Sequence, residues 1–95
     1  MTKLSEAEIL ERLTKAKDWE RHGDMLVRTW QFPSFRRAME FVNQVAGLIE
    51  KIAHHPDIIV RYRTVRIETS THDAGGLTDL DFALIAQINE LSTDR

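Results

Sequence analysis

The chain has 95 residues, of which 42% are hydrophobic and none is cysteine. This length allows one small domain over residues 1–95, with a thin core that self-association would support. The absence of cysteine excludes disulfides, thiolate metal sites and a cysteine nucleophile. The 13 basic and 15 acidic residues give a formal net charge of -2, which argues against nucleic acid as a direct ligand.

The start of the chain carries charged residues almost at once, and no stretch approaches the roughly 20 apolar residues that a membrane span needs. We therefore expect a cytoplasmic protein without membrane association. Three of the four histidines, His54, His55 and His72, lie close together in the chain. This cluster is the main feature that a function has to explain.

The first expected element is a short α-helix. Ser5 can cap it, and Glu8 stands at its third position, which is the pattern of a capping box. We expect the helix to end near Lys15. Its apolar stripe should consist of Ile9, Leu10 and Leu13.

A β-hairpin is expected next. The turn signal His22-Gly23-Asp24 separates the strand segments 19–21 and 25–32. Arg28 shares a strand face with Leu26 and Trp30, so that face is either half buried or the arginine snorkels to solvent.

The strongest helix pattern covers residues 35–53, with Ser34 as its cap. Apolar residues recur there at three- and four-residue spacing, namely Phe35, Ala38, Val42, Val45, Ile49 and Ile52. The helix should stop at His54-His55-Pro56, because the residue before a proline is disfavoured in the helical region. The aromatic residues are interpreted as core, and they include Trp19, Trp30, Phe35 and Phe41.

Two further strands, 58–62 and 64–69, are rich in β-branched residues and precede a Gly75-Gly76 loop. Thr78 then caps a third helix with acidic residues in its first turn. The order α-β-β-α-β-β-α predicts an α+β fold, a two-layer sandwich with the helices on one face of the sheet. The other sheet face and the sheet edges are candidate subunit contacts.

The histidine cluster suggests acid-base chemistry. Glu50 precedes His54 by one helical turn, so that the carboxylate and the imidazole can meet on one helix face. The helix C-terminus favours an imidazolium, which makes His54 a candidate proton donor near neutral pH. His72 lies in a loop whose Gly75-Gly76 pair lets the backbone approach a ligand, and it is the candidate acceptor.

Simpler interpretations remain open. The adjacent histidines could form a solvated helix end. A metal site is less favoured because neighbouring histidines rarely converge on one ion, and its ligands would be His54, His55, His72 and Asp73. An anion patch competes with a plain solvated strand face, and its members would be Arg61, Arg63 and Arg66.

Fixed spacings connect these residues into one pattern. Its members are Glu50, His54-His55-Pro56, Tyr62, Thr71-His72-Asp73, Gly75-Gly76-Leu77-Thr78 and Asp81. This pattern resembles the signature of the pterin-4a-carbinolamine dehydratases, also called 4a-hydroxytetrahydrobiopterin dehydratases, and the resemblance covers nearly the whole chain. It implies a four-stranded antiparallel sheet with three helices on one face, and a homodimer or homotetramer.

The resemblance also implies an activity, that of a hydro-lyase. Such an enzyme removes water from 4a-hydroxytetrahydrobiopterin to give quinonoid dihydropterin, in the recycling of tetrahydrobiopterin that serves aromatic amino acid hydroxylases. The leaving hydroxyl needs a proton, and N5 of the pterin must lose one. Two imidazoles can do both without a metal or an organic cofactor.

By position in the family pattern, His54 corresponds to the acid at the hydroxyl, His72 to the group that takes the N5 proton, and His55 to a histidine lining the site. Glu50 would orient His54. Further expected pterin contacts are Pro56, Thr71, Asp73 and Ala74. Asp81 corresponds to the closing acid of the motif, although a first-turn helix charge explains it equally well.

The alternative is a non-catalytic binding or assembly module on the same fold. Members of the family serve as dimerisation cofactors of a transcription factor or as assembly chaperones for a carbon-fixing enzyme, and fold alone does not decide between these roles. The complete histidine set, His54, His55 and His72, favours catalysis.

Overall fold

The computed structural model describes residues 2–91, which form three α-helices and a four-stranded sheet. The elements are α1 (Glu6–Leu13), β1 (Glu20–His22), β2 (Met25–Gln31), α2 (Phe35–Ile52), β3 (Asp57–Arg61), β4 (Thr64–Thr69), the 3-10 turn η1 (His72–Ala74) and α3 (Asp79–Asn89). This order confirms the predicted α+β fold.

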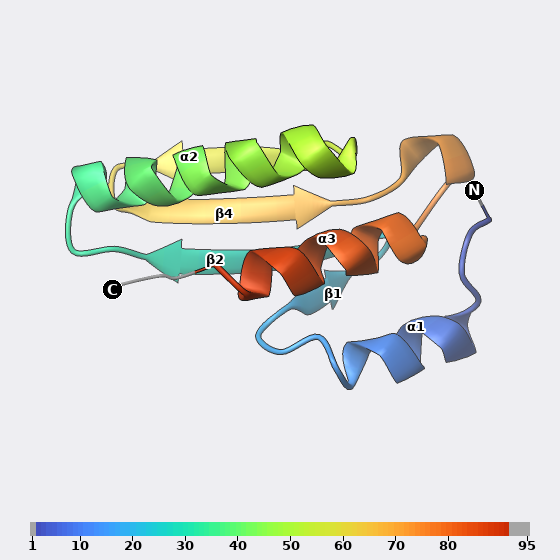
Figure 1. Ribbon diagram of the computed structural model, residues 1–95. Helices are drawn as coiled ribbons and strands as arrows, with labels where there is room; N and C mark the ends of the chain where they lie inside the picture. Colours follow the sequence, from blue (N-terminus) through green and yellow to red (C-terminus); the bar gives the residue numbers. More distant parts are fainter. Residues whose placement is uncertain (1, 92–95) are drawn as a thin grey trace.

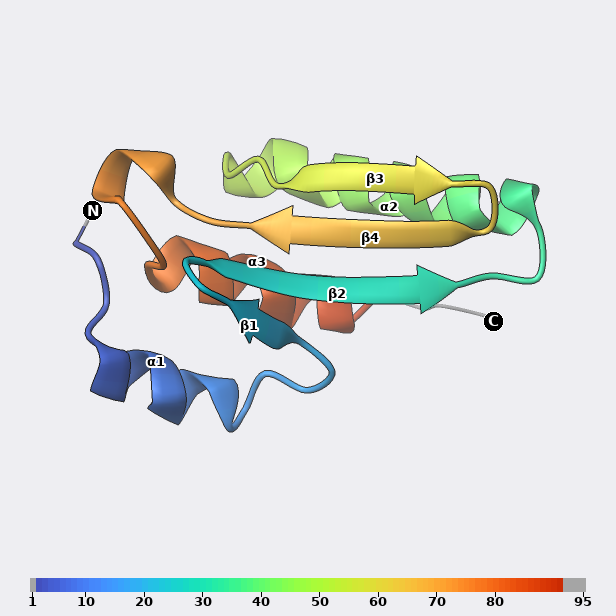
Figure 2. The ribbon, with the colours of Figure 1, turned by 180° about the vertical axis from the view of Figure 1, so that it is seen from behind.

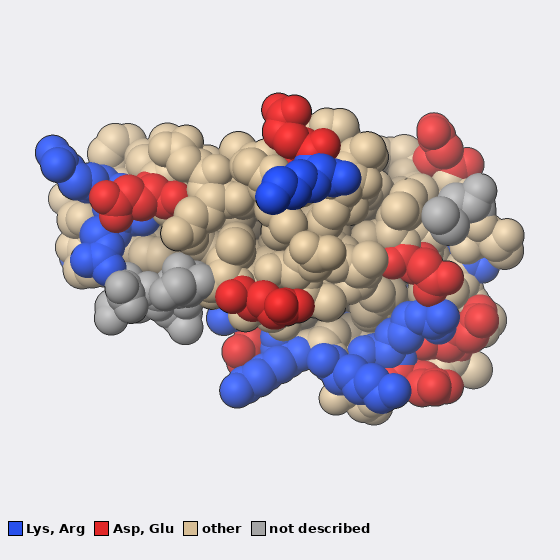
Figure 3. Space-filling view, viewed as in Figure 1, with Lys and Arg blue, Asp and Glu red and all other residues tan. Residues whose placement is uncertain are grey.

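The sheet is antiparallel throughout and has the strand order β1-β2-β4-β3. Helices α2 and α3 cover one of its faces, and α1 lies beside β1 (Figure 1). The reverse view shows the strands in front and these two helices behind them (Figure 2). Acidic and basic residues are intermixed on the helix-covered side (Figure 3).

The core lies between the sheet and the two covering helices. Trp30 packs edge-on against Trp19, with 5.8 Å between ring centroids, and also contacts Phe41. Arg28 shares this face as expected, because its Nη1 donates to Asn89 Oδ1 at 2.7 Å while its guanidinium lies 4.7 Å from the Trp30 ring centroid. Arg28 is therefore held at the edge of the two-layer sandwich by a hydrogen bond to Asn89 and by a cation–π contact with Trp30.

Three local predictions were wrong. Helix α1 ends at Leu13, not near Lys15. Leu10 is 62% exposed and Phe35 is 49% exposed, so neither belongs to the core. Phe35 is the first residue of α2, and the first turn of this helix extends past the ends of the strands on which its later turns pack (Figure 1).

Helix α2 ends one residue earlier than predicted, and for a different reason. Ala53 adopts a left-handed conformation, with φ 59, and its N–H donates to the Ile49 carbonyl. The helix is thus closed by a left-handed cap before the proline restriction acts. The next strand, β3, begins at Asp57, one residue before its predicted start.

Within residues 2–91, none of the helices combines the length and the apolar character needed to span a bilayer.

Candidate active site

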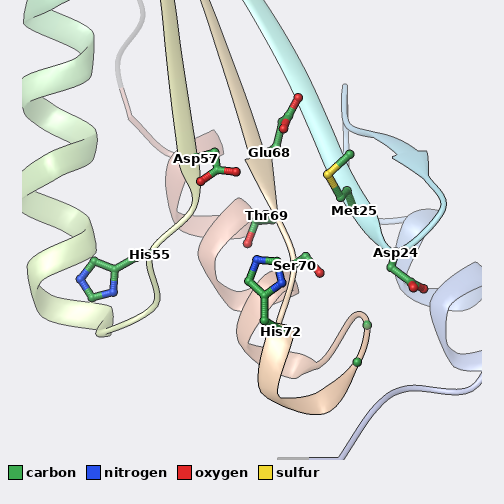
Figure 4. Close-up of a pocket in the computed structure, with 10 residues that line it drawn as sticks. Asp24, Met25, His55, Asp57, Glu68, Thr69, Ser70 and His72 are labelled. Carbon is green, nitrogen blue, oxygen red and sulfur yellow. The ribbon is translucent and has the colours of Figure 1, made fainter.

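A cavity of about 320 Å³ lies where β4 ends and β3 begins. Two of its lining residues are histidines, His55 from the segment between α2 and β3, and His72 from η1. Figure 4 shows the carboxylates of Asp57 and Glu68 on the strands, with the His72 ring toward the strand ends. Asp24, from the turn between β1 and β2, and Met25, the first residue of β2, also line the cavity.

The loop that carries His72 is held in shape by its own backbone. Thr71 and Gly76 form an isolated antiparallel bridge, and Gly75 closes η1 in a left-handed conformation with φ 76. Glycine adopts this conformation without steric cost, so the chain can turn back sharply and leave His72 exposed at the cavity.

His54 occupies a different environment from the other two histidines. It is 9% exposed and is not among the residues that line the cavity, and its Nε2 lies 2.7 Å from Oδ1 of the fully buried Asp81. This pairing fixes the ring orientation and makes Nε2 the nitrogen that carries a hydrogen. Nδ1 is then the ring nitrogen left for other partners.

Asp81 is the centre of a buried hydrogen-bond network. Besides His54, its oxygens accept from Thr69 Oγ1 at 2.6 Å, from Thr71 Oγ1 at 2.7 Å and from the Thr78 N–H at 3.0 Å. The last bond is half of a capping box that starts α3. Asp81 is therefore a first-turn helix acid and a histidine anchor at the same time.

The expected pairing of Glu50 with His54 is not found. Glu50 is exposed, and no hydrogen bond or ion pair joins it to His54 among residues 2–91. The one-turn spacing requires the helix to continue through His54, but α2 ends at Ile52 and Ala53 turns the chain away. The orientation of His54 thus comes from Asp81.

The other expected pterin contacts are divided by the structure. Thr71 is 8% exposed, and its hydroxyl is engaged with Asp81 and Thr78, so its side chain faces the buried network. Asp73 is exposed and Ala74 half-buried on η1, one and two residues beyond His72. Pro56 is half-buried between two cavity residues, His55 and Asp57.

Sequence reasoning missed several residues of the cavity and the network. Those missed are Asp24, Met25, Asp57, Glu68 and Thr69. The Asp57–Glu68 pairing follows from the two-residue turn that joins β3 and β4, whereas the predicted strands over 58–62 and 64–69 leave a one-residue link and shift the register by one position. No group of three or more His, Asp or Glu side chains in residues 2–91 is arranged to hold a metal ion.

The architecture and the site define a class: a small α+β protein with a histidine-lined cavity at the strand ends and a buried aspartate anchoring a further histidine. A family model described as pterin 4 alpha carbinolamine dehydratase matches residues 2–91. The chain belongs to this family, as its residue spacing predicted.

Similar proteins support this membership over their whole length. A protein of Thermomicrobium roseum is 48% identical over 93 residues, which cover 98% of this chain and 100% of that protein. One of Chloroflexus aggregans is 51% identical over 92 residues, covering 96% and 98% of the two chains. Both are named "Putative pterin-4-alpha-carbinolamine dehydratase".

Solved structures agree with the fold. A crystal structure of a transcriptional coactivator/pterin dehydratase from Brucella melitensis superposes with a TM-score of 0.87 at 30% identity, covering 93% of this chain and 96% of the other. A pterin dehydratase-like protein, described as a RuBisCO assembly factor in the alpha-carboxysome, superposes with a TM-score of 0.60 at 22% identity, covering 75% and 82%. The second likeness concerns the fold alone.

Proposed function

We propose that the protein is a hydro-lyase that dehydrates 4a-hydroxytetrahydrobiopterin, or a related pterin-4a-carbinolamine, to the quinonoid dihydropterin. The observation that carries the proposal is that His55 and His72 line one cavity. His54, the residue directly before His55, is anchored to Asp81. Membership of the pterin carbinolamine dehydratase family supplies the substrate class.

The reaction needs one proton delivered and one removed. The C4a–O bond breaks with its electron pair on oxygen, which takes a proton and leaves as water, while the N5–H bond gives up its pair to form the N5=C4a double bond. We assign the donor role to His54 through Nδ1, because Asp81 holds Nε2. His72, exposed at the cavity, accepts the N5 proton, and His55 positions the ring.

The test follows dehydration of chemically generated 4a-hydroxytetrahydropterin by ultraviolet absorbance. We expect the protein to exceed the spontaneous rate, and His54→Ala and His72→Ala each to lose about 10²-fold, as for removal of one acid-base group. His22→Ala is a matched control, because His22 is exposed on β1 and contacts Glu20 outside the cavity. A wild-type rate equal to the spontaneous rate would refute the enzymatic proposal.

We also propose that the chain forms a homodimer or homotetramer, as its family pattern implies. Strand β3 is at the edge of the sheet, so its outer backbone groups are open to another chain, and Tyr62 at its end is 70% exposed. Light scattering after size-exclusion chromatography measures the mass directly. A purely monomeric protein at all concentrations contradicts this part of the proposal.

A binding or assembly role is the second candidate, because the Brucella structure at 30% identity is described as a transcriptional coactivator as well as a pterin dehydratase. The two roles separate in the same assay. A binding module without catalysis leaves the rates of wild type and of His72→Ala equal to the spontaneous rate.

A further inference from the structure

Two carboxylates face each other across the strands that border the cavity. Asp57 on β3 and Glu68 on β4 are direct partners in the antiparallel register. Like charges placed directly opposite destabilise a sheet. Both residues line the cavity that also holds His55 and His72, so the unfavourable pair stands at the candidate site.

The two carboxylates differ in whether a basic side chain is already bound to them. Glu68 Oε2 accepts from Arg66 Nε at 2.7 Å, and the Glu68 side chain is only 18% exposed. Asp57 is exposed, and no hydrogen bond or ion pair is found for it within residues 2–91. The cavity therefore contains an acceptor with both oxygens unused, next to a second carboxylate that has one oxygen committed.

The carboxylates that line the cavity favour one type of ligand group. Asp24 adds a third carboxylate to the lining, which makes the cavity unfavourable for an anionic group and favourable for N–H donors. Metal binding does not explain the set, because no three such side chains in the described part of the chain are arranged to hold an ion. A planar group with two parallel N–H bonds suits one carboxylate, as the guanidinium of arginine does.

We propose that Asp57, supported by Glu68, is the specificity-determining residue that binds the amino-pyrimidinone edge of the pterin. This edge carries the N3–H and the 2-amino group side by side, so it presents two parallel donors to the two carboxylate oxygens. The inference rests on the proposed function for the identity of the ring. In the proposed pose the pyrimidine ring lies against the strands that carry Asp57 and Glu68, and the C4a–N5 bond lies toward His72, which Figure 4 shows beyond the strand ends.

The experiment compares two ligands that differ only at this edge. Affinities for 7,8-dihydropterin and for its 2-oxo analogue, in which oxygen replaces the amino group, are measured by titration calorimetry. The proteins are wild type, Asp57→Asn, Glu68→Gln and the matched control Glu20→Gln. Glu20 lies on the same sheet face, since it pairs with Val27, which in turn pairs with Glu68, but it does not line this cavity.

We expect wild type and Glu20→Gln to prefer 7,8-dihydropterin by about tenfold or more, in line with a charge-assisted hydrogen bond. Asp57→Asn should remove most of this preference, and Glu68→Gln a smaller part. An unchanged preference in Asp57→Asn, an equal loss of affinity for both ligands, or no preference in wild type would each overturn the inference.

The binding readout keeps this inference separate from the proposed function. If the protein discriminates between the two ligands through Asp57 but does not accelerate dehydration, the proposed recognition by Asp57 stands and the enzymatic proposal fails. If the protein accelerates dehydration and Asp57→Asn discriminates as well as wild type, the enzymatic proposal stands and the proposed role of Asp57 fails.

Discussion

The first turns of α1 and α3 carry the same local motif in different surroundings. Ser5 and Glu8 form a capping box at α1, with bonds of 3.2 Å and 2.8 Å, and Thr78 and Asp81 form one at α3. Ser5 and Glu8 are exposed, whereas Thr78 and Asp81 are fully buried. The same capping motif therefore begins one helix at the exposed surface and another helix at a buried position.

The difference lies in what else the acid contacts. The Glu8 carboxylate accepts from the Ser5 N–H, and within residues 2–91 this is the hydrogen bond found for that carboxylate. Asp81 also receives hydrogen bonds from Thr69 and Thr71 and is paired with His54. A buried carboxylate is stable only when such partners are present, and these partners connect the start of α3 to the candidate catalytic histidine. Burial thus turns a helix cap into part of the site.

The largest expected effect comes from Asp81→Ala. Removal of the carboxylate leaves His54, two threonine hydroxyls and one backbone N–H without their buried partner, so unfolding in urea should become easier by roughly 3–5 kcal/mol. Asp81→Asn keeps the shape and should cost less. A loss below about 1 kcal/mol for the alanine variant would show that the network contributes little.

Matched substitutions of the two capping hydroxyls test the comparison directly. Thr78→Ala removes a cap to the Leu80 N–H and a buried bond to Thr71, so we expect a loss of about 2 kcal/mol. Ser5→Ala removes only an exposed cap and should cost no more than about 1 kcal/mol. Equal losses in urea unfolding would contradict the importance of burial.

Thr71→Val tests whether this threonine positions the site or binds substrate. Its hydroxyl contacts Asp81 and Thr78 and not the cavity, so kcat should fall several-fold while KM stays near the wild-type value. Thr71→Ser retains the hydroxyl and should restore kcat. A rise in KM with kcat unchanged would instead support the substrate contact that the family pattern implies.

Local patterns predicted the order of the elements and all three helix caps, because each depends on residues a few positions apart. Ser5, Ser34 and Thr78 all cap as expected. The end of α2 was less predictable, since the left-handed conformation of Ala53 is not favoured by its residue type. That one residue decides whether Glu50 can reach His54.

The partners of the histidines depend on tertiary structure. His54 and Asp81 are separated by 27 positions, and their contact requires α3 to pack beside the end of α2. Both residues belong to the motif, but their spacing alone does not indicate a bond. The Asp57–Glu68 pair is intermediate, because strand register determines it once the hairpin is placed.

The smallest expected effect concerns the charge of Glu8. Hydrogen bonds, first from the Ser5 backbone and then from its side chain, lower the pKa of Glu8 below its ordinary value of 4.5. A lowered folded-state pKa means that ionised Glu8 favours the fold, so this contribution is present above pH 4.5 and fades as pH falls through the folded-state pKa. Glu8→Gln retains the capping geometry without the charge. Urea midpoints of the two proteins should therefore differ slightly at pH 7 and converge in acid, whereas a gap that widens as pH falls would contradict this account.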